Sequence, residues 1–218
     1  MSAGGQVFGK ATLAEFHAAL AASSSERLKE QLRRFVSFDH WIAFEAALHH
    51  GDLTISGSLK VPAYCTLIDG QLDVSGDLDL RNPGIEEGGL FVVLGNVSCN
   101  RLIGEYGKCV FIDGDIEARE AVITGFHDSS LVVCGGLSTR LFIGCDIAAE
   151  VGDGAVMDYG VGTCVPLGGL ATPAQAVAPR NDEAATARAV WPESKEDGYL
   201  FDAEQFIARI DAGLPILR

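Results

Sequence analysis

A glycine-led pattern recurs five times between residues 51 and 160, and it constrains the fold more than any other feature of this sequence. Each copy reads Gly-x-φ-x-φ, where φ is an apolar or small residue: GDLTI, GQLDV, GNVSC, GDIEA and GGLST, beginning at residues 51, 70, 95, 114 and 135. Successive copies begin 19, 25, 19 and 21 residues apart. A period of about 20 residues is typical of repeat proteins, in which each repeat buries its apolar side against the next.

The apolar positions keep their register through all five copies. The third position is aliphatic throughout, at Leu53, Leu72, Val97, Ile116 and Leu137. An apolar run precedes four of the glycines, and an apolar pair follows each copy. The pattern therefore predicts a mainly β chain, a parallel β-solenoid (β-helix) of about five coils stacked ~4.8 Å apart. We expect the glycines at the corners, because glycine accepts positive φ angles.

Two other all-β folds were weighed against the solenoid. A β-sandwich also has short strands between Gly or Asp turns, but its strands need not repeat one apolar register. A leucine-rich repeat has a similar period, but its Leu-x-x-Leu-x-Leu pattern is missing. The longest repeat is explained by residues 81–89, RNPGIEEGG, which have turn chemistry and no apolar pattern. The solenoid is favoured, with its handedness left open.

Residues 1–50 are predicted to form a helical cap. Thr12 and Glu15 fit a capping box. Apolar residues then recur at helical spacing in three groups: Leu13, Phe16 and Leu20; Leu28, Leu32, Phe35 and Val36; and Phe38, Trp41, Ile42 and Leu48. The end of a solenoid exposes strand edges that template association unless they are covered. We expect these helices to cover the first end.

Residues 51–160 then form the solenoid, and residues 161–218 an irregular connection plus a C-terminal helix packed on the solenoid. Residues 161–192 hold Pro, Gly and Ala without a clear period. Asp202 is a suitable N-cap for the last helix, Gly213 a suitable C-terminal residue, and Pro215 bars continuation. We expect this segment to cover the second end or a flank.

The charge of the chain is concentrated in the repeat region. The net charge is −14, and residues 51–160 carry 17 acidic and six basic side chains. Such a surface repels nucleic acid and anionic lipid and attracts basic partners. No apolar run approaches the ~20 residues needed to span a bilayer, and MSAGGQVFGK lacks the apolar core of a signal peptide. We expect a cytoplasmic protein that binds neither membrane nor nucleic acid.

The search for chemistry yields no site. Asp69 and Asp113 each precede a repeat glycine, but corners two rungs apart lie ~10 Å from each other, too far for shared acid chemistry, so we assign them to turns. His49 and His50 fit no metal motif, and the six cysteines form no C-x-x-C pair. P-loop, G-x-S-x-G, H-E-x-x-H and Rossmann motifs are missing. We expect a protein that is not an enzyme, with no catalytic, cofactor-binding or metal-binding residues.

The polar residues that alternate with the apolar column predict an outward face. They lie at the second and fourth positions of each copy: Asp52, Thr54, Gln71, Asp73, Asn96, Ser98, Asp115, Glu117, Gly136 and Ser138. Together with nearby acidic residues they offer a docking surface for a basic protein; a plain solvated face is the alternative. The candidate partner-binding residues are Asp73, Asp77, Asp115, Glu117 and Glu120.

Several stretches resemble small bacterial β-solenoid proteins of the polymer-forming, bactofilin-like group: GDLTISGSLKV, VVLGNVSCNRLIG, VFIDGDIEAREAVITG and LVVCGGLSTRLFIG. The ending DAGLPILR is similar to that of a narrower set with a helical front piece and a C-terminal helix. Members of that set are often encoded beside secreted polymorphic toxins. The resemblance implies a solenoid fold and an immunity role, and it implies no catalytic residues.

The sequence departs from bactofilins in the 50 residues that precede its first coil. Covered ends argue against filaments and for a monomer or small homo-oligomer. We therefore expect a non-enzymatic protein-binding module, an immunity or inhibitor protein that sequesters a basic toxin domain through its acidic face. The alternative is a bactofilin-like scaffold that assembles with itself.

Overall fold

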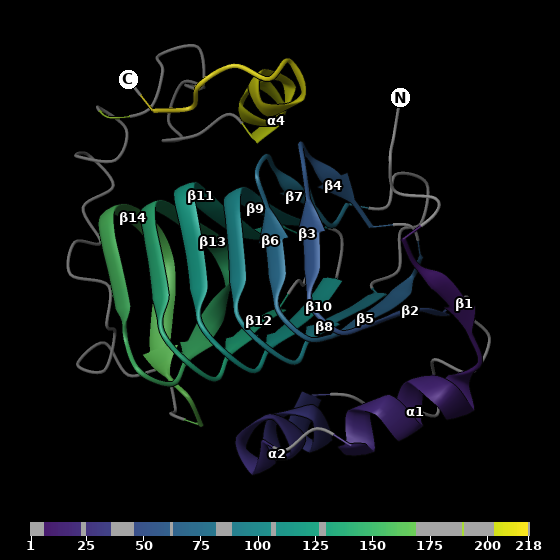
Figure 1. The fold of residues 1–218 in the computed structure, drawn as a ribbon. Coiled ribbons are helices and arrows are strands. Elements are labelled where there is room, and N and C mark those ends of the chain that lie inside the picture. Colours follow the sequence, from purple (N-terminus) through teal and green to yellow (C-terminus); the bar gives the residue numbers. More distant parts are fainter. Residues whose placement is uncertain are drawn as a thin grey trace.

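The computed structural model describes residues 7–22, 25–35, 46–61, 63–81, 89–105, 108–126, 130–168, 189 and 203–217. Within these ranges the chain is a parallel β-solenoid of about five turns, with N-terminal helices and a short C-terminal helix (Figure 1). The predicted fold class is confirmed. Each turn supplies strands to three faces, which we call the first, second and third face in chain order.

The first face is a stack of parallel strands. It comprises β2 (Ala46–His50), β5 (Cys65–Asp69), β8 (Gly89–Val93), β10 (Lys108–Ile112) and β12 (Ser130–Val133). The ends of the two longest strands continue it, because Val132 pairs with Glu150 and Ala149 pairs with Cys164.

The second and third faces share their later strands. The second face is built from β3 (Leu53–Ile55), β6 (Leu72–Val74) and the first residues of β9 (Val97–Glu105), β11 (Ile116–Phe126), β13 (Leu137–Val151) and β14 (Ala155–Pro166). The third face is built from β4 (Leu59–Lys60), β7 (Leu78–Asp79) and later residues of the same four long strands. Register shifts separate the two faces, for example between Ala118 and Ala121.

The predicted inward column is confirmed as a ladder of paired residues. Leu53 pairs with Leu72, Leu72 with Val97, Val97 with Ile116, and Ile116 with Leu137. All five side chains are buried in one core cluster that runs the length of the solenoid. Stacking thus buries aliphatic groups that a single coil would leave in water.

The corner glycines are needed for a different reason from the one expected. Among the repeat glycines, only Gly51 has a positive φ, of 84°. The others pack directly on the rung before them: a Cβ on Gly114 would lie 2.9 Å from the backbone nitrogen of Asn96. The corner therefore demands close approach between rungs more than an unusual backbone conformation.

The N-terminal helices lie along the first face and do not close the end of the solenoid (Figure 1). Helices α1 (Leu13–Ala22) and α2 (Glu26–Phe35) bury Phe16 and Leu28 against outward residues of this face, including Leu67 and Phe111. At the first end, residues 7 and 8 pack against the inner core instead, and β1 (Gly9–Ala11) pairs antiparallel with β2. The predicted N-terminal helices are confirmed, and the two described here bury an apolar face that runs along the coils.

The helix starts follow the sequence closely. In the predicted capping box, the Glu15 backbone N–H donates to Thr12 Oγ1 at 3.2 Å, and the Thr12 N–H donates to Glu15 Oε2 at 2.7 Å. The backbone hydrogen bond from Thr12 lowers the pKa of Glu15. Ser25 caps the second helix, since its Oγ accepts from the Leu28 N–H at 3.1 Å.

The sheet extends past the predicted boundaries on both sides. Residues 46–50, AALHH, were assigned to the helical region but form β2, with Leu48 opposite Leu67 of β5. Alanines favour helix locally, and pairing with the next rung overrides that preference. At the other side, β14 continues to Pro166. The predicted apolar residues Phe38, Trp41 and Ile42 lie outside the described residues.

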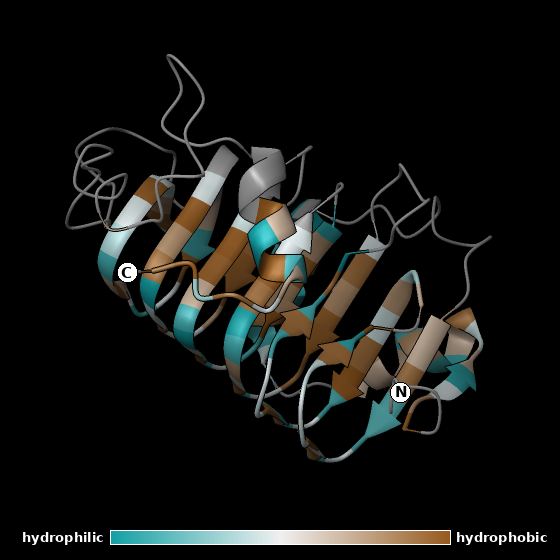
Figure 2. Cartoon of the chain, turned by 90° about the horizontal axis from the view of Figure 1, so that it is seen from above, coloured by the Kyte–Doolittle hydropathy of each residue, from teal (hydrophilic) through white to brown (hydrophobic). Residues whose placement is uncertain are grey.

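The C-terminal segment covers the third face, which is a flank of the solenoid. A flank was one of its two expected positions; the other was the second end. Helix α4 (Ala203–Asp211) is terminated by Gly213, whose φ is 66° and whose N–H donates to the Ile210 carbonyl. The Leu214 N–H donates to the Arg209 carbonyl, which completes a Schellman motif. The segment then crosses strands that are largely apolar (Figure 2). Asp202, the predicted N-cap, lies outside the described residues.

Candidate functional site

The three faces of the solenoid differ in what lies on them. The first face carries α1 and α2, and the third carries α4 and residues 212–217. Over the second face, the described part of the chain places no helix or strand (Figure 1). We call this second surface the open face. Its central outward column consists of Thr54, Asp73, Ser98, Glu117, Ser138 and Val156.

The open face is acidic and contains two of the five predicted docking residues in its central column. Asp73 and Glu117 are exposed and lie two rungs apart, ~10 Å along the solenoid. Among the described residues, neither carboxylate forms a hydrogen bond or an ion pair. At the last rung, Val156 is 70% exposed. The central column thus offers negative charge that no described residue pairs with.

Asp115, the third predicted docking residue, lies at the corner and has a structural task. Its Oδ1 accepts a hydrogen bond from the Gly136 N–H of the next rung at 2.7 Å. In the same way, Asn96 Oδ1 accepts from the Asp115 N–H at 2.9 Å, and Asp52 Oδ1 accepts from the Gln71 N–H at 2.8 Å. This column is a ladder in which short oxygen-bearing side chains tie successive corners together. The side chain of Asp115 is nonetheless exposed to solvent.

Beside this ladder lies an open groove of about 440 Å³, between the corner and the start of α2. Asp113, Asp115 and Asp153 contribute three carboxylates, and among the described lining residues Arg27 alone is basic. Arg27 contacts the Cys134 carbonyl and forms an ion pair with Asp153 at 3.3 Å. The groove therefore keeps an acidic character and adjoins the open face through Asp115.

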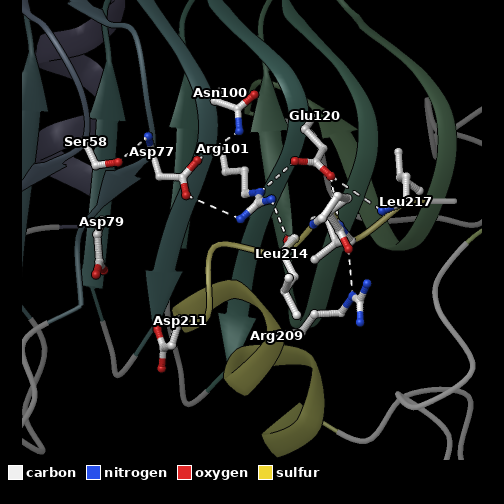
Figure 3. Close-up of polar contacts among 12 residues, drawn as sticks. Ser58, Asp77, Asp79, Asn100, Arg101, Glu120, Arg209, Asp211, Leu214 and Leu217 are labelled. Atoms are coloured by element: carbon white, nitrogen blue, oxygen red, sulfur yellow. Dashed lines mark hydrogen bonds and ion pairs between the residues drawn. The ribbon is translucent and has the colours of Figure 1, made fainter.

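Asp77 and Glu120, the remaining two predicted residues, serve an internal cluster at the corner between the second and third faces (Figure 3). Both flank Arg101, whose side chain is 5% exposed. Arg101 Nε donates to Glu120 Oε2 at 2.7 Å, and its Nη1 lies 3.4 Å from Asp77 Oδ2. Asn100 also donates to Asp77, at 3.0 Å. The structure thus separates these two carboxylates from the exposed pair.

The same cluster holds the C-terminal tail, residues 212–217, by its backbone (Figure 3). Arg101 Nη2 donates to the Leu214 carbonyl at 2.8 Å, and the Ile216 N–H donates to Glu120 Oε1 at 2.9 Å. Ile216 and Leu217 are buried among outward aliphatic residues of the third face, such as Ile123 and Ile143. Sequence analysis missed this contact because Arg101 and Leu214 lie 113 residues apart.

Lys108 is a buried amine that sequence analysis also missed, since a lysine before the apolar run CVFI resembles a polar strand end. It is 2% exposed, and its Nζ donates to the Tyr64 carbonyl at 3.2 Å. Burial lowers the pKa of Lys108 to about 8. The missing side chain of Gly89 leaves room for the lysine to pass.

Four of the cysteines are held away from water. Cys65, Cys99, Cys134 and Cys164 are buried free thiols. Burial raises the pKa of Cys65 to about 11 and that of Cys99, Cys134 and Cys164 to about 12. Thiolate formation is therefore disfavoured at neutral pH. The prediction of buried, reduced thiols is confirmed for these four.

Two kinds of feature were sought in the described ranges, a cluster of metal ligands and a membrane-spanning helix. No three His, Cys, Asp or Glu side chains there are grouped as metal ligands. His49 contacts the Val7 carbonyl and His50 contacts Asp69, at 3.0 and 3.2 Å. Of the helices described, none combines the length and apolarity required to cross a bilayer.

Comparison of the chain with protein-family models, with curated proteins and with solved structures found no match in any of the three.

Proposed function

We propose that this protein is a non-enzymatic binding module that captures a basic protein on its open face. The observation that carries the proposal is the composition of that face. Its two outward columns, at the second and fourth repeat positions, hold four carboxylates and no lysine or arginine: Asp52, Asp73, Asp115 and Glu117. Arg119 and Arg140 are exposed at the edge of this face, where Arg119 donates to the Ser75 carbonyl and Arg140 lies 3.4 Å from Asp158, so the excess of negative charge lies in these two columns. Such an excess steers basic partners toward the face.

The geometry supports docking in two further ways. The open face is a regular sheet surface supported by a continuous core, so its side chains are held at fixed spacing without loops. The adjoining groove places Asp113 and Asp153 beside Asp115, where a lysine or arginine from a partner fits by charge. Binding here would block the partner by occlusion, which needs no chemistry from this chain.

A basic toxin domain is the partner class that we propose, with this protein as its immunity factor. The support is the acidic open face together with the resemblance to bactofilin-like solenoids encoded beside toxins. The scaffold alternative draws on the same resemblance. Against it stands β1, whose antiparallel pairing occupies the outer edge of β2 at the first end. An antiparallel edge strand does not continue a parallel stack of coils.

Binding to the product of the adjacent gene tests the proposal. The purified proteins are mixed and the complex is detected by size-exclusion chromatography and interferometry. We expect D73K/E117K to weaken binding by roughly tenfold or more, because each reversal turns attraction into repulsion at the interface. The matched control compares E117K with E30K, which makes the same change in net charge on the exposed side of α2 and should leave binding within about twofold. Equal losses in both variants would reject the open face, and filaments of the purified protein in electron micrographs would favour the scaffold.

A further inference from the structure

The tail, residues 212–217, lies on an apolar strip of the third face, which we call the tail groove and which is separate from the acidic groove beside α2. Its composition resembles that of a peptide-binding site. Its floor is the outward aliphatic surface of the third face, formed by Ile103, Ala121, Ile123, Leu141 and Ile143. Its rim is the pair Arg101 and Glu120. An apolar floor with a rim that bonds backbone groups is the arrangement by which proteins bind extended peptides.

Recognition of the tail is directed mainly at its main chain. Arg101 binds a carbonyl oxygen of the tail, and Glu120 accepts from the N–H of Ile216 at 2.9 Å and, more weakly, from that of Leu217 at 3.5 Å. Specificity for side chains comes from Ile216 and Leu217, which are buried, whereas Leu214 is 45% exposed. The ligand chemistry that fits this groove is thus an extended peptide that contains two adjacent aliphatic residues.

Contacts within the solenoid orient the groups that hold the tail. Arg101 is positioned from the solenoid side by Asp77 and Glu120, with Asn100 donating to Asp77 in turn. The floor residues belong to strands paired on both sides. The acceptor and donor groups are therefore oriented by the coils themselves, and an incoming peptide does not have to order them.

We propose that this groove is a peptide-recognition site whose ligand is the C-terminal segment in trans as well as in cis, so that the tail of a second copy can occupy it. The tail seated in the groove shows that its chemistry fits. The 20 residues between Gly168 and Ala189 allow a span of up to ~70 Å, enough to reach a neighbouring copy. The inference is independent of the proposed docking face.

Exchange after cleavage in place tests this inference on the folded whole chain. A protease site is introduced within residues 169–188, the folded protein is cut, and a fluorescent peptide of residues 203–218 is added. We expect the peptide to displace the cut segment and give a rise in anisotropy that saturates. The affinity of the uncut protein for the same peptide should be lower by roughly 100-fold or more, because its own tail competes at millimolar effective concentration.

Two altered peptides distinguish specific recognition from nonspecific hydrophobic binding. One carries I216D and L217D, and the other is methylated on the backbone nitrogen of Ile216, which removes the donor to Glu120. Both should bind the cut protein at least roughly tenfold more weakly, since one loses the apolar contacts and the other a charge-assisted hydrogen bond. In the protein, E120Q should weaken binding several-fold, whereas E117Q, a matched change on the same strand, should not.

Complementation between two full-length variants provides the second test. One copy carries I216D/L217D and offers an empty groove; the other carries E120Q/R101Q and offers an unheld tail. We expect a heterodimer when the two are mixed and monomers when each is alone. No exchange and no heterodimer, or loss of the solenoid's circular-dichroism spectrum on cutting, would overturn the inference and make the segment a fixed part of the fold.

Discussion

The first and open faces share one backbone geometry and differ in the residues that point outward. On the first face the outward column runs Leu48, Leu67, Val92, Phe111 and Val132, and two helices cover it. On the open face the corresponding column holds Thr54, Asp73, Ser98, Glu117 and Ser138, and the described chain leaves it uncovered. A solenoid face thus recruits a cover when its outward column is apolar and stays available to a partner when that column is charged.

The largest expected effect comes from the covered face. Phe16 of α1 is 1% exposed and lies in the cluster between the helices and the first face. F16A should lower the free energy of unfolding by about 3–5 kcal/mol, from lost burial and a residual cavity. Urea denaturation measures the change. E30A, on the exposed side of α2, is the control and should cost no more than about 0.5 kcal/mol. A loss as small for F16A would mean that the helices contribute little to the fold.

Lys108 sharpens the comparison, since it is a charged group beneath the covered face. Its pKa is lowered to about 8 from 10.5. Between these values the unfolded chain holds a proton that the folded chain has lost, so this group makes the free energy of unfolding rise with pH through that window and penalises the fold below pH 8. K108M should therefore stabilise the protein by about 2–3 kcal/mol at pH 7.

The pH dependence of that difference is the control for Lys108. Urea unfolding of wild type and K108M at pH 7, 8 and 9 isolates this group from the buried cysteines, which both proteins share. The stabilisation by K108M should shrink by about 1 kcal/mol between pH 7 and pH 9. A constant difference would show that the folded protein keeps this proton up to pH 9, and hence that its pKa is not lowered.

The corner between the two faces gives a smaller effect with a matched control one rung away. An added Cβ on Gly114 would lie 2.9 Å from the Asn96 nitrogen, whereas on Gly136 its nearest contact would be 3.6 Å. G114A should cost about 1–3 kcal/mol through overpacking. G136A should cost no more than about 0.5 kcal/mol. Thermal and urea unfolding compare the two, and equal costs would contradict the close-approach explanation of the corner glycines.

The smallest effect is expected on the open face. Asp73 and Glu117 make no hydrogen bond or ion pair with the described residues, so D73K/E117K should change the free energy of unfolding by no more than about 0.5 kcal/mol. Urea denaturation checks this, with E117K beside E30K as the matched pair. A cost of several kcal/mol would assign the two carboxylates to the fold and would make the binding experiment with this variant uninterpretable.

The repeat made the core predictable and left the long-range contacts hidden. The alternation at Leu53, Leu72 and their equivalents predicts the inward column because stacking demands one apolar register. The same register predicts β2, since AALHH precedes Gly51 as CTLID precedes Gly70; local helix preference concealed it. The helices' apolar stripes show that they are covered, but a stripe does not say against which surface.

The candidate site was predictable to the extent that side-chain direction follows the period of two. Asp73 and Glu117 point outward as expected. The positions of Asp77 and Glu120 depend on Arg101 and on a tail about 100 residues further along the chain, and no local pattern contains that information. Ion pairs and tail contacts of this kind depend on which residues the fold brings together in space.

Carboxyl footprinting of the complex with the basic partner tests the central claim most directly. The protein is labelled with carbodiimide and an amine, alone and bound, and modification is read by mass spectrometry at each acidic residue. We predict that Asp73 and Glu117 react in the unbound protein and are protected in the complex, while Glu30 reacts in both. Equal labelling of Asp73 and Glu117 in the two states, with the complex verified, would contradict the assignment of the open face as the docking surface.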